Sequence, residues 1–297
     1  MNFLKLIRWP NLVIVILTQL CVKYFLINAL LSDENISTEV SFFSMLILVL
    51  ATVFVTASGY IINDIYDIDT DKVNKPTKQF VGKEISVKQS WRLYLVFSVV
   101  GFALGVVFGF MLGVPWLGVI FFVIELLLWG YSFWMKSIAL IGNFAVAILS
   151  AFVIVIVWLP EFLLSENLGE MTFLVLIYSL FAFMVSLIRE IIKDTEDIKG
   201  DAAIKCLTLP IVIGKPKTKI VVSVLILLSI SIMVLFQFVM FQQKNYLLFV
   251  YLLLFVQLPF LWLLYKNYTA LSQMDFHKAG SFAKLIMLTG ILSMILV

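Results

Sequence analysis

The chain has 297 residues, of which 63% are hydrophobic and only 13% are charged, with a net charge of +3. Soluble domains carry about 45–50% apolar and roughly 25% charged residues, so this composition excludes a soluble globular protein, and its 27 Phe and 10 Tyr exclude a disordered one. The apolar runs are continuous and do not alternate in segments of about ten residues, which excludes a transmembrane β-barrel.

Nine segments are apolar over about 20 residues, the length that crosses a bilayer as a helix. The first is long and lacks a small-residue cleavage site, so we interpret it as a retained span and not as a signal peptide. We predict an all-α polytopic membrane protein with a single domain over residues 1–297. In chain order, the predicted spans are residues 11–31, 40–62, 91–113, 115–134, 138–158, 171–189, 218–241, 246–265 and 281–297.

The basic residues predict the orientation of these spans. If the N-terminus is cytoplasmic, 19 of the 21 Lys and Arg lie on the cytoplasmic side, as the positive-inside rule requires. The outer connections 32–39 and 160–170 contain acidic residues and no basic ones. We therefore expect an integral protein of the cytoplasmic membrane with its N-terminus inside and its C-terminus outside.

Two of the predicted cytoplasmic loops, residues 63–90 and 190–217, are much longer than a connection requires. Loops of this length are commonly functional. Each holds 5 of the 18 acidic residues although it lies on the positive side. This excess of acid marks the two loops as the candidate site.

Each loop contains the pattern D-x-x-D-x-x-x-D directly after an apolar span. On a helix of 3.6 residues per turn, the three carboxylates of each set share one face, whereas Asp69 and Glu196 point elsewhere. Like charges on one face repel, so the pattern predicts bound cations, and oxygen ligands of this kind suit Mg²⁺ together with substrate phosphates. The two sets are Asp64, Asp67 and Asp71, and Asp194, Asp197 and Asp201.

Two such sets on one side of the membrane predict a metal-assisted diphosphate site, with lysines near each set as phosphate contacts. A solvated acidic face is the structural alternative for either set alone. A transporter with carboxylates along its pathway is the alternative from another functional class. Transporter sites tend to lie near the bilayer midplane, whereas these acids lie at its edge.

These residues resemble the UbiA-type intramembrane prenyltransferases. The family motif N-D-x-x-D-x-x-x-D is matched in full from Asn63 to Asp71, and the second aspartate motif is followed by a family-like Thr208-Leu209-Pro210. The resemblance extends over nearly the whole chain, and three further stretches carry it: Arg8-Trp9-Pro10-Asn11, Tyr131 to Lys136, and Gly142-Asn143.

The resemblance implies a ring of nine helices around a central cavity, capped by the two long loops. It implies Mg²⁺-dependent transfer of a polyprenyl group from its diphosphate to a lipid-phase acceptor, with no nucleic acid and no obligate protein partner. The six aspartates would hold the diphosphate through metal, with Asn63 and Lys193 positioning it. Further candidate substrate contacts are Lys72, Lys78, Tyr131, Lys136, Asn11 and Asn143, and Tyr60, Tyr66 and Tyr131 could stabilise an allylic cation.

Within that family, the run from Arg189 to Asp201 looks most like the digeranylgeranylglyceryl phosphate synthases, which alkylate geranylgeranylglyceryl phosphate. The sequence departs from them at Lys78-Gln79, where relatives usually have Arg-Pro, and Lys does not replace a bidentate Arg neutrally. Quinone-precursor, haem and carotenoid-like acceptors therefore stay open.

Three isolated residues lie outside this scheme. Lys23 and Glu125 lie within apolar spans, where ionisable side chains are costly, and their similar depth predicts a structural ion pair between them. His277 is a lone histidine in the last cytoplasmic loop, and we expect no ligand role for it.

Overall fold

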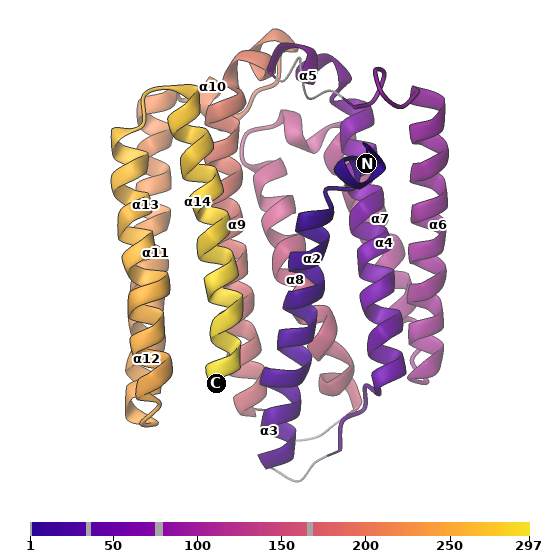
Figure 1. Ribbon diagram of the computed structural model, residues 1–297, viewed down its shortest axis with the longest axis vertical. Coiled ribbons are helices and arrows are strands. Elements are labelled where there is room, and N and C mark those ends of the chain that lie inside the picture. The colour runs from indigo at the N-terminus through magenta and orange to yellow at the C-terminus, as the bar shows by residue number, and fades with distance from the viewer. Residues whose placement is uncertain (1, 34–36, 75–79, 165–168) are drawn as a thin grey trace.

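The computed structural model describes residues 2–33, 37–74, 80–164 and 169–297. Within these ranges the regular secondary structure is helical, as predicted, and the long helices run side by side (Figure 1). Among the described residues, eight helical stretches are long and apolar enough to cross a membrane. They are Trp9–Leu31, Phe42–Tyr66 (α4), Val87–Met111 (α6), Ile141–Leu164 (α8), Met171–Ala203 within α9 (Gly169–Ala203), Lys215–Gln242 (α11), Tyr246–Thr269 and Gln273–Leu296.

The ninth predicted span is α7 (Leu117–Phe133), an apolar helix of 17 residues. All nine predicted segments thus correspond to helices, and the predicted membrane fold is confirmed. The first stretch is α2 (Trp9–Cys21), a π-helical turn (Val22–Ile27) and α3 (Asn28–Asp33). The stretch that ends at Thr269 is α12 (Tyr246–Leu252), a second π-helical turn (Leu253–Gln257) and α13 (Leu258–Thr269), and the last begins with α14 (Gln273–Leu292).

Short helices lie across the end of the bundle that carries the N-terminus (Figure 1). They are α5 (Ile68–Asn74) and α10 (Leu209–Val212), while α1 (Asn2–Leu6) precedes α2. We call this the capped end. Both predicted long loops lie here, so the structure brings the two acidic segments to one end of the bundle.

The second of these loops is shorter than predicted, because α9 does not end at Arg189 but continues to Ala203. The predicted end was set by the first charged residue. A helix needs apolar side chains only inside the bilayer, and beyond it the backbone hydrogen bonds of residues 190–203 still favour the helix.

Glycine is required at one turn and at one helix contact in the bundle. Gly113 in the α6–α7 turn has a φ of 69°, a conformation that glycine adopts without a steric penalty. A Cβ on Gly290 of α14 would lie 2.1 Å from the ring of Phe181 on α9. Glycine at position 290 therefore allows α14 to pack directly against α9.

The predicted ion pair between Lys23 and Glu125 is wrong. Lys23 Nζ lies 2.8 Å from Glu161 Oε1, and both side chains are at most 3% exposed. Glu161 also accepts hydrogen bonds from Thr38 and from the backbone N–H groups of Glu39 and Val40. Glu125 instead accepts a hydrogen bond from the Ser58 hydroxyl, 2.9 Å away. Depth along a helix did not reveal which neighbour each side chain faces.

We expect Lys23→Met to lower the stability of the folded protein by about 3 kcal/mol, because it leaves Glu161 charged and unpaired in a buried site. The double variant Lys23→Met/Glu161→Leu should recover part of that loss. Thermal unfolding in detergent measures both. Combining Lys23→Met with Glu125→Gln should give additive effects; strong coupling between that pair would contradict the observed contacts.

Candidate functional site

A polar cavity of about 310 Å³ lies at the capped end. Its lining includes all six predicted aspartates, together with Asn63, Tyr131, Lys136 and Lys193. We call it the acidic cavity. Residues from the two loops, separated by more than a hundred positions in the chain, thus face one space.

The first aspartate set lies where α4 ends. The helix stops at Tyr66, Asp67 is its C-cap with φ −90° and ψ 5°, and α5 begins at Ile68. Asn63 Nδ2 donates a hydrogen bond of 2.6 Å to Asp67 Oδ2. The expected continuous helix through Asp71 is therefore interrupted at Asp67, yet Asp64, Asp67 and Asp71 all line the cavity.

The second set lies on the uninterrupted α9, as the spacing predicts. Asp194 Oδ2 accepts a hydrogen bond of 2.8 Å from Asn143 Nδ2 near the start of α8. Asp197 is only 9% exposed. Burial of these carboxylates in a shared cavity raises the free energy of their charged forms unless cations are near.

Basic side chains compensate part of this charge. Arg8 Nη2 lies 2.7 Å from Asp64 Oδ1, and Lys136 Nζ lies 2.5 Å from Asp67 Oδ1. Burial acts to lower the pKa of the Arg8 guanidinium, but the side chains of Asp64, Tyr60 and Asp67 together outweigh it and hold that pKa above its ordinary value. Both cations are therefore fixed beside the first aspartate set.

Lys136 is placed by a contact between two distant loops. The Leu207 backbone N–H donates to the Ser137 carbonyl at 2.9 Å, and the Cys206 thiol donates to the Ser137 hydroxyl. The segment after α9 thus joins the segment after α7, and Lys136 is held against Asp67.

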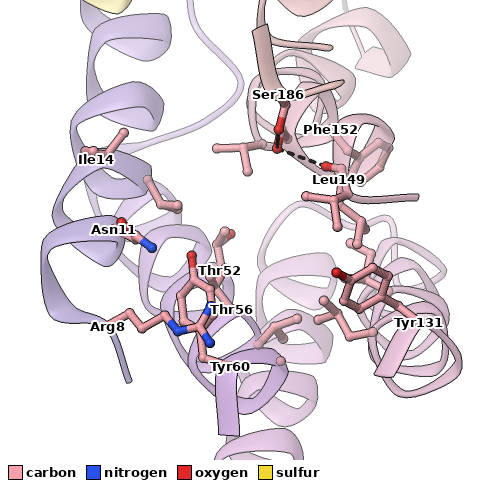
Figure 2. Close-up of a pocket in the computed structure, with 18 of the residues that line it drawn as sticks. Arg8, Asn11, Ile14, Thr52, Thr56, Tyr60, Tyr131, Leu149, Phe152 and Ser186 are labelled. Carbon is pink, nitrogen blue, oxygen red and sulfur yellow. Dashed lines mark hydrogen bonds between the residues drawn. The ribbon is translucent and has the colours of Figure 1, made fainter. Parts of the chain in front are cut away.

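A second cavity of about 260 Å³ lies within the bundle, and Figure 2 shows part of its lining. Most of its lining is apolar and comes from α2, α4, α7, α8, α9 and α14. We call it the apolar cavity. Five residues line both spaces and mark their junction: Arg8, Asn63, Tyr131, Glu190 and Lys193.

Aromatic rings lie around this junction. Tyr131 points into the cavity from α7, and Tyr60 lies beside Arg8 (Figure 2). The Arg8 guanidinium stacks over the Tyr60 ring at 4.8 Å. Tyr66 contacts Trp91 and Phe133 instead, and it lines neither cavity. Tyr60 and Tyr131 are therefore the tyrosines near the cavity junction.

Of the two further lysine predictions, one does not fall in the cavity and the other cannot be placed. Lys72 pairs with the exposed Asp69 at 2.6 Å and is not part of the lining. Lys78 lies outside the described residues. Asn11 lines the apolar cavity, and His277 contacts Glu196 away from both cavities.

Sequence reasoning left several cavity residues out of the candidate site. Arg8 belongs to a stretch that carries the family resemblance, and Glu190 falls on the face of the second aspartate set. Arg189 opens the run that resembles the digeranylgeranylglyceryl phosphate synthases, but nothing in the sequence assigned it a contact in the site. Lys284 had no such signal, because it is a single cation near the start of an apolar segment. The structure places both in the lining of the apolar cavity.

The donor set of the acidic cavity suits a hard divalent cation, since carboxylate oxygens predominate. The Asn63 amide oxygen is also buried at the junction without a hydrogen-bond partner. In the described part of the chain, no three acidic, His or Cys side chains are close enough to hold a metal by themselves. A Mg²⁺ ion would fit here with its remaining ligands supplied by water and substrate phosphate.

Comparisons with known proteins identify the family of this chain. The model of the UbiA prenyltransferase family matches residues 26–285. A digeranylgeranylglyceryl phosphate synthase from Methanosphaera stadtmanae is 29% identical over 238 residues, which cover 80% of this chain and 82% of the relative.

Solved structures share the fold. A structure described as digeranylgeranylglyceryl phosphate synthase aligns with a TM-score of 0.66 at 22% identity, over 100% of this chain and 98% of the other. A UbiA homologue from Archaeoglobus fulgidus, bound to DMAPP and Mg²⁺, aligns with a TM-score of 0.61 at 14% identity, over 99% of both chains. At these identities the likeness establishes the fold alone.

We expect Mn²⁺, used as a spectroscopic substitute for Mg²⁺, to bind the purified protein in the presence of pyrophosphate. Asp67→Asn or Asp197→Asn should weaken this binding by at least about tenfold, since even outer-shell partners of metal ligands account for roughly 10–100-fold in affinity. Electron paramagnetic resonance of free Mn²⁺ measures the change. Asp69→Asn is the matched control, because Asp69 is exposed and outside the cavity lining; an equal loss in this variant would contradict the assignment.

Proposed function

This chain belongs to the UbiA prenyltransferase family, and from that membership we propose that it transfers a geranylgeranyl group from its diphosphate to geranylgeranylglyceryl phosphate, using Mg²⁺. Family membership makes it an integral membrane prenyltransferase. We further propose the identity of the two substrates, the metal and the role of each site residue.

One observation carries it: a carboxylate-lined cavity shares five lining residues with an adjoining, mostly apolar cavity between membrane helices. A prenyl diphosphate has the same division, with a highly charged head and a hydrocarbon tail. The head fits the acidic cavity only with cations, and the tail fits the apolar cavity, where burial of hydrocarbon is favourable.

The reaction begins with ionisation of the allylic diphosphate. The bond between C1 of the prenyl chain and the diphosphate oxygen breaks, and its electron pair leaves with the diphosphate. Mg²⁺ supplies, when bound, most of the charge that stabilises this leaving group. Lys136 and Lys193 line the acidic cavity and are placed to donate hydrogen bonds to the same oxygens.

The allylic cation forms at the junction of the two cavities. The aromatic faces of Tyr60 and Tyr131 are nearby, and such faces attract cations. The apolar lining keeps water from capturing the cation. The acceptor hydroxyl then attacks C1, a C–O bond forms, and its proton passes to a carboxylate; we assign this role to Glu190, which lines both cavities.

The relatives support the choice of acceptor and metal. The Methanosphaera relative is a digeranylgeranylglyceryl phosphate synthase and aligns over most of both chains. The Archaeoglobus homologue with the same fold is bound to DMAPP and Mg²⁺. An aromatic acceptor is the alternative outcome of the assay described below.

We also propose that the capped end faces the cytoplasm. The connections at this end carry most of the basic residues, as the positive-inside rule requires. A water-soluble diphosphate head would then enter from the cytoplasm, while the acceptor lipid enters from the bilayer.

The purified protein, given labelled geranylgeranyl diphosphate and Mg²⁺, should release pyrophosphate and form a diether product with geranylgeranylglyceryl phosphate. Asp64→Ala and Asp194→Ala should each lower the rate by about 100-fold or more, because each removes charge that stabilises the leaving group. Removal of the metal with a chelator should abolish transfer, and added Mg²⁺ should restore it.

A hydroxynaphthoate acceptor, offered separately, tests the aromatic alternative. Transfer to it in preference to the glycerophosphate would overturn the proposed acceptor and leave prenyl transfer standing. Product formation that is independent of both aspartates would overturn the proposed site.

A further inference from the structure

The side chains that line the apolar cavity carry a net positive charge, although most of the lining is apolar. Four cationic side chains and a single carboxylate, Glu190, contribute to its lining. The cations are Arg8, Arg189, Lys193 and Lys284. The acidic cavity has the opposite balance, with seven carboxylates and four cations in its lining.

Three of these four cations have nearby carboxylates. Arg8 pairs with Asp64, Arg189 pairs with Glu190, and Lys193 lies in the field of Glu190 and Asp197. Arg8 and Lys193 also line the acidic cavity, and the charge of Arg189 is balanced by Glu190, so these three cations leave no positive charge in excess.

Lys284 differs from the other three. Among the described residues, no carboxylate lies within ion-pair distance of its ammonium group, and the group donates a hydrogen bond to the neutral amide oxygen of Asn11. The charge of Arg189 acts on Lys284 and repels it. An ammonium group facing an apolar cavity beside a second cation is unfavourable without an anion.

Three helices bring these polar groups together. Asn11 lies near the start of α2, Arg189 on α9 and Lys284 on α14, and all three line the apolar cavity. The amide oxygen of Asn11 accepts a hydrogen bond from Lys284. The N–H groups of the same amide are therefore able to donate to another acceptor. The guanidinium of Arg189 has five N–H donors, more than its contact with Glu190 uses. The cluster therefore offers donors from three directions and a net positive charge.

We propose that Lys284, with Arg189 and Asn11, binds the head-group phosphate of the acceptor lipid. This inference rests on the proposed function and assigns a second anion subsite, separate from the aspartate-lined diphosphate site. The donor diphosphate occupies the acidic cavity, and the acceptor phosphate lies on the other side of Glu190. The acceptor hydroxyl, a few bonds from its phosphate, then lies at the junction beside C1 of the prenyl chain.

A purely structural role for Lys284 makes a different prediction. If the ammonium group only ties α14 to α2 through Asn11, its loss lowers stability and affects all acceptors equally. If it binds phosphate, its loss affects only acceptors that carry a phosphate. The selectivity between two acceptors separates the two roles.

The experiment compares geranylgeranylglyceryl phosphate with geranylgeranylglycerol, which lacks the phosphate, in the wild type and in Lys284→Met. We expect kcat/KM for the phosphorylated acceptor to fall roughly 10–100-fold in the variant, mainly through KM, because one charged hydrogen bond is lost. The value for geranylgeranylglycerol should stay unchanged, so the preference for phosphate disappears. Lys284→Arg should retain most of the preference.

Lys278→Met is the matched control, since Lys278 lies on the same helix, is exposed and lines neither cavity; it should behave as the wild type. Lys284→Gln serves as a second neutral variant in case Lys284→Met does not fold. A preference for phosphate that persists in a folded neutral variant would overturn the subsite.

A binding measurement separates failure of this inference from failure of the proposed function. Without any donor, geranylgeranylglyceryl phosphate should raise the thermal unfolding midpoint of the wild type and of Lys278→Met, but not that of Lys284→Met. If the wild type shows this shift yet transfers no prenyl group, the proposed function fails and the subsite stands. If the shift is equal in all three proteins, the subsite fails whether or not transfer occurs.

Discussion

Repulsion among carboxylates is the constraint on which the capped end depends. Six aspartates and Glu190 line a cavity of about 310 Å³, and charges this close raise each other's energy unless cations lie between them. The protein supplies some of these cations itself, through Arg8 on Asp64 and Lys136 on Asp67. In the proposed function, bound metal and substrate supply the rest of the compensation, so that a diphosphate binds strongly to carboxylates that are not neutralised permanently.

The helices around the acidic cavity place several of the aspartates beside a side chain that donates a hydrogen bond or carries a positive charge. The break at Asp67 turns the chain from α4 into α5 across the end of the bundle, while α9 continues unbroken and carries its aspartates on one face. Asn143 orients Asp194, and Asn63 orients Asp67. The Ser137–Leu207 contact then fixes Lys136 above the first set. Neutral amides and a few cations thus hold acidic side chains in place.

Charged side chains elsewhere in the membrane region also need a partner of opposite charge. At the opposite end, Lys23 and Glu161 neutralise each other in a buried pair that also holds the chain near Val40. Lys284 has no such partner in the described structure and faces the apolar cavity. A fully paired buried charge is structural, whereas a cation without a carboxylate in a cavity points to a ligand that brings the negative charge.

The helical membrane class, the nine apolar segments and the six aspartates of the candidate site could all be predicted from the sequence, because composition, segment length and 3.6-residue spacing are local properties of the chain. The resemblance to the prenyltransferase family was also visible there. Which side chains from different helices meet became apparent only in the packed bundle. Lys23 faces Glu161 and not Glu125, Lys72 pairs with the exposed Asp69 outside the acidic cavity, and Arg189 and Lys284 line the apolar cavity. These outcomes depend on the rotation and tilt of each helix against its neighbours, which packing of the whole bundle sets and no local pattern encodes.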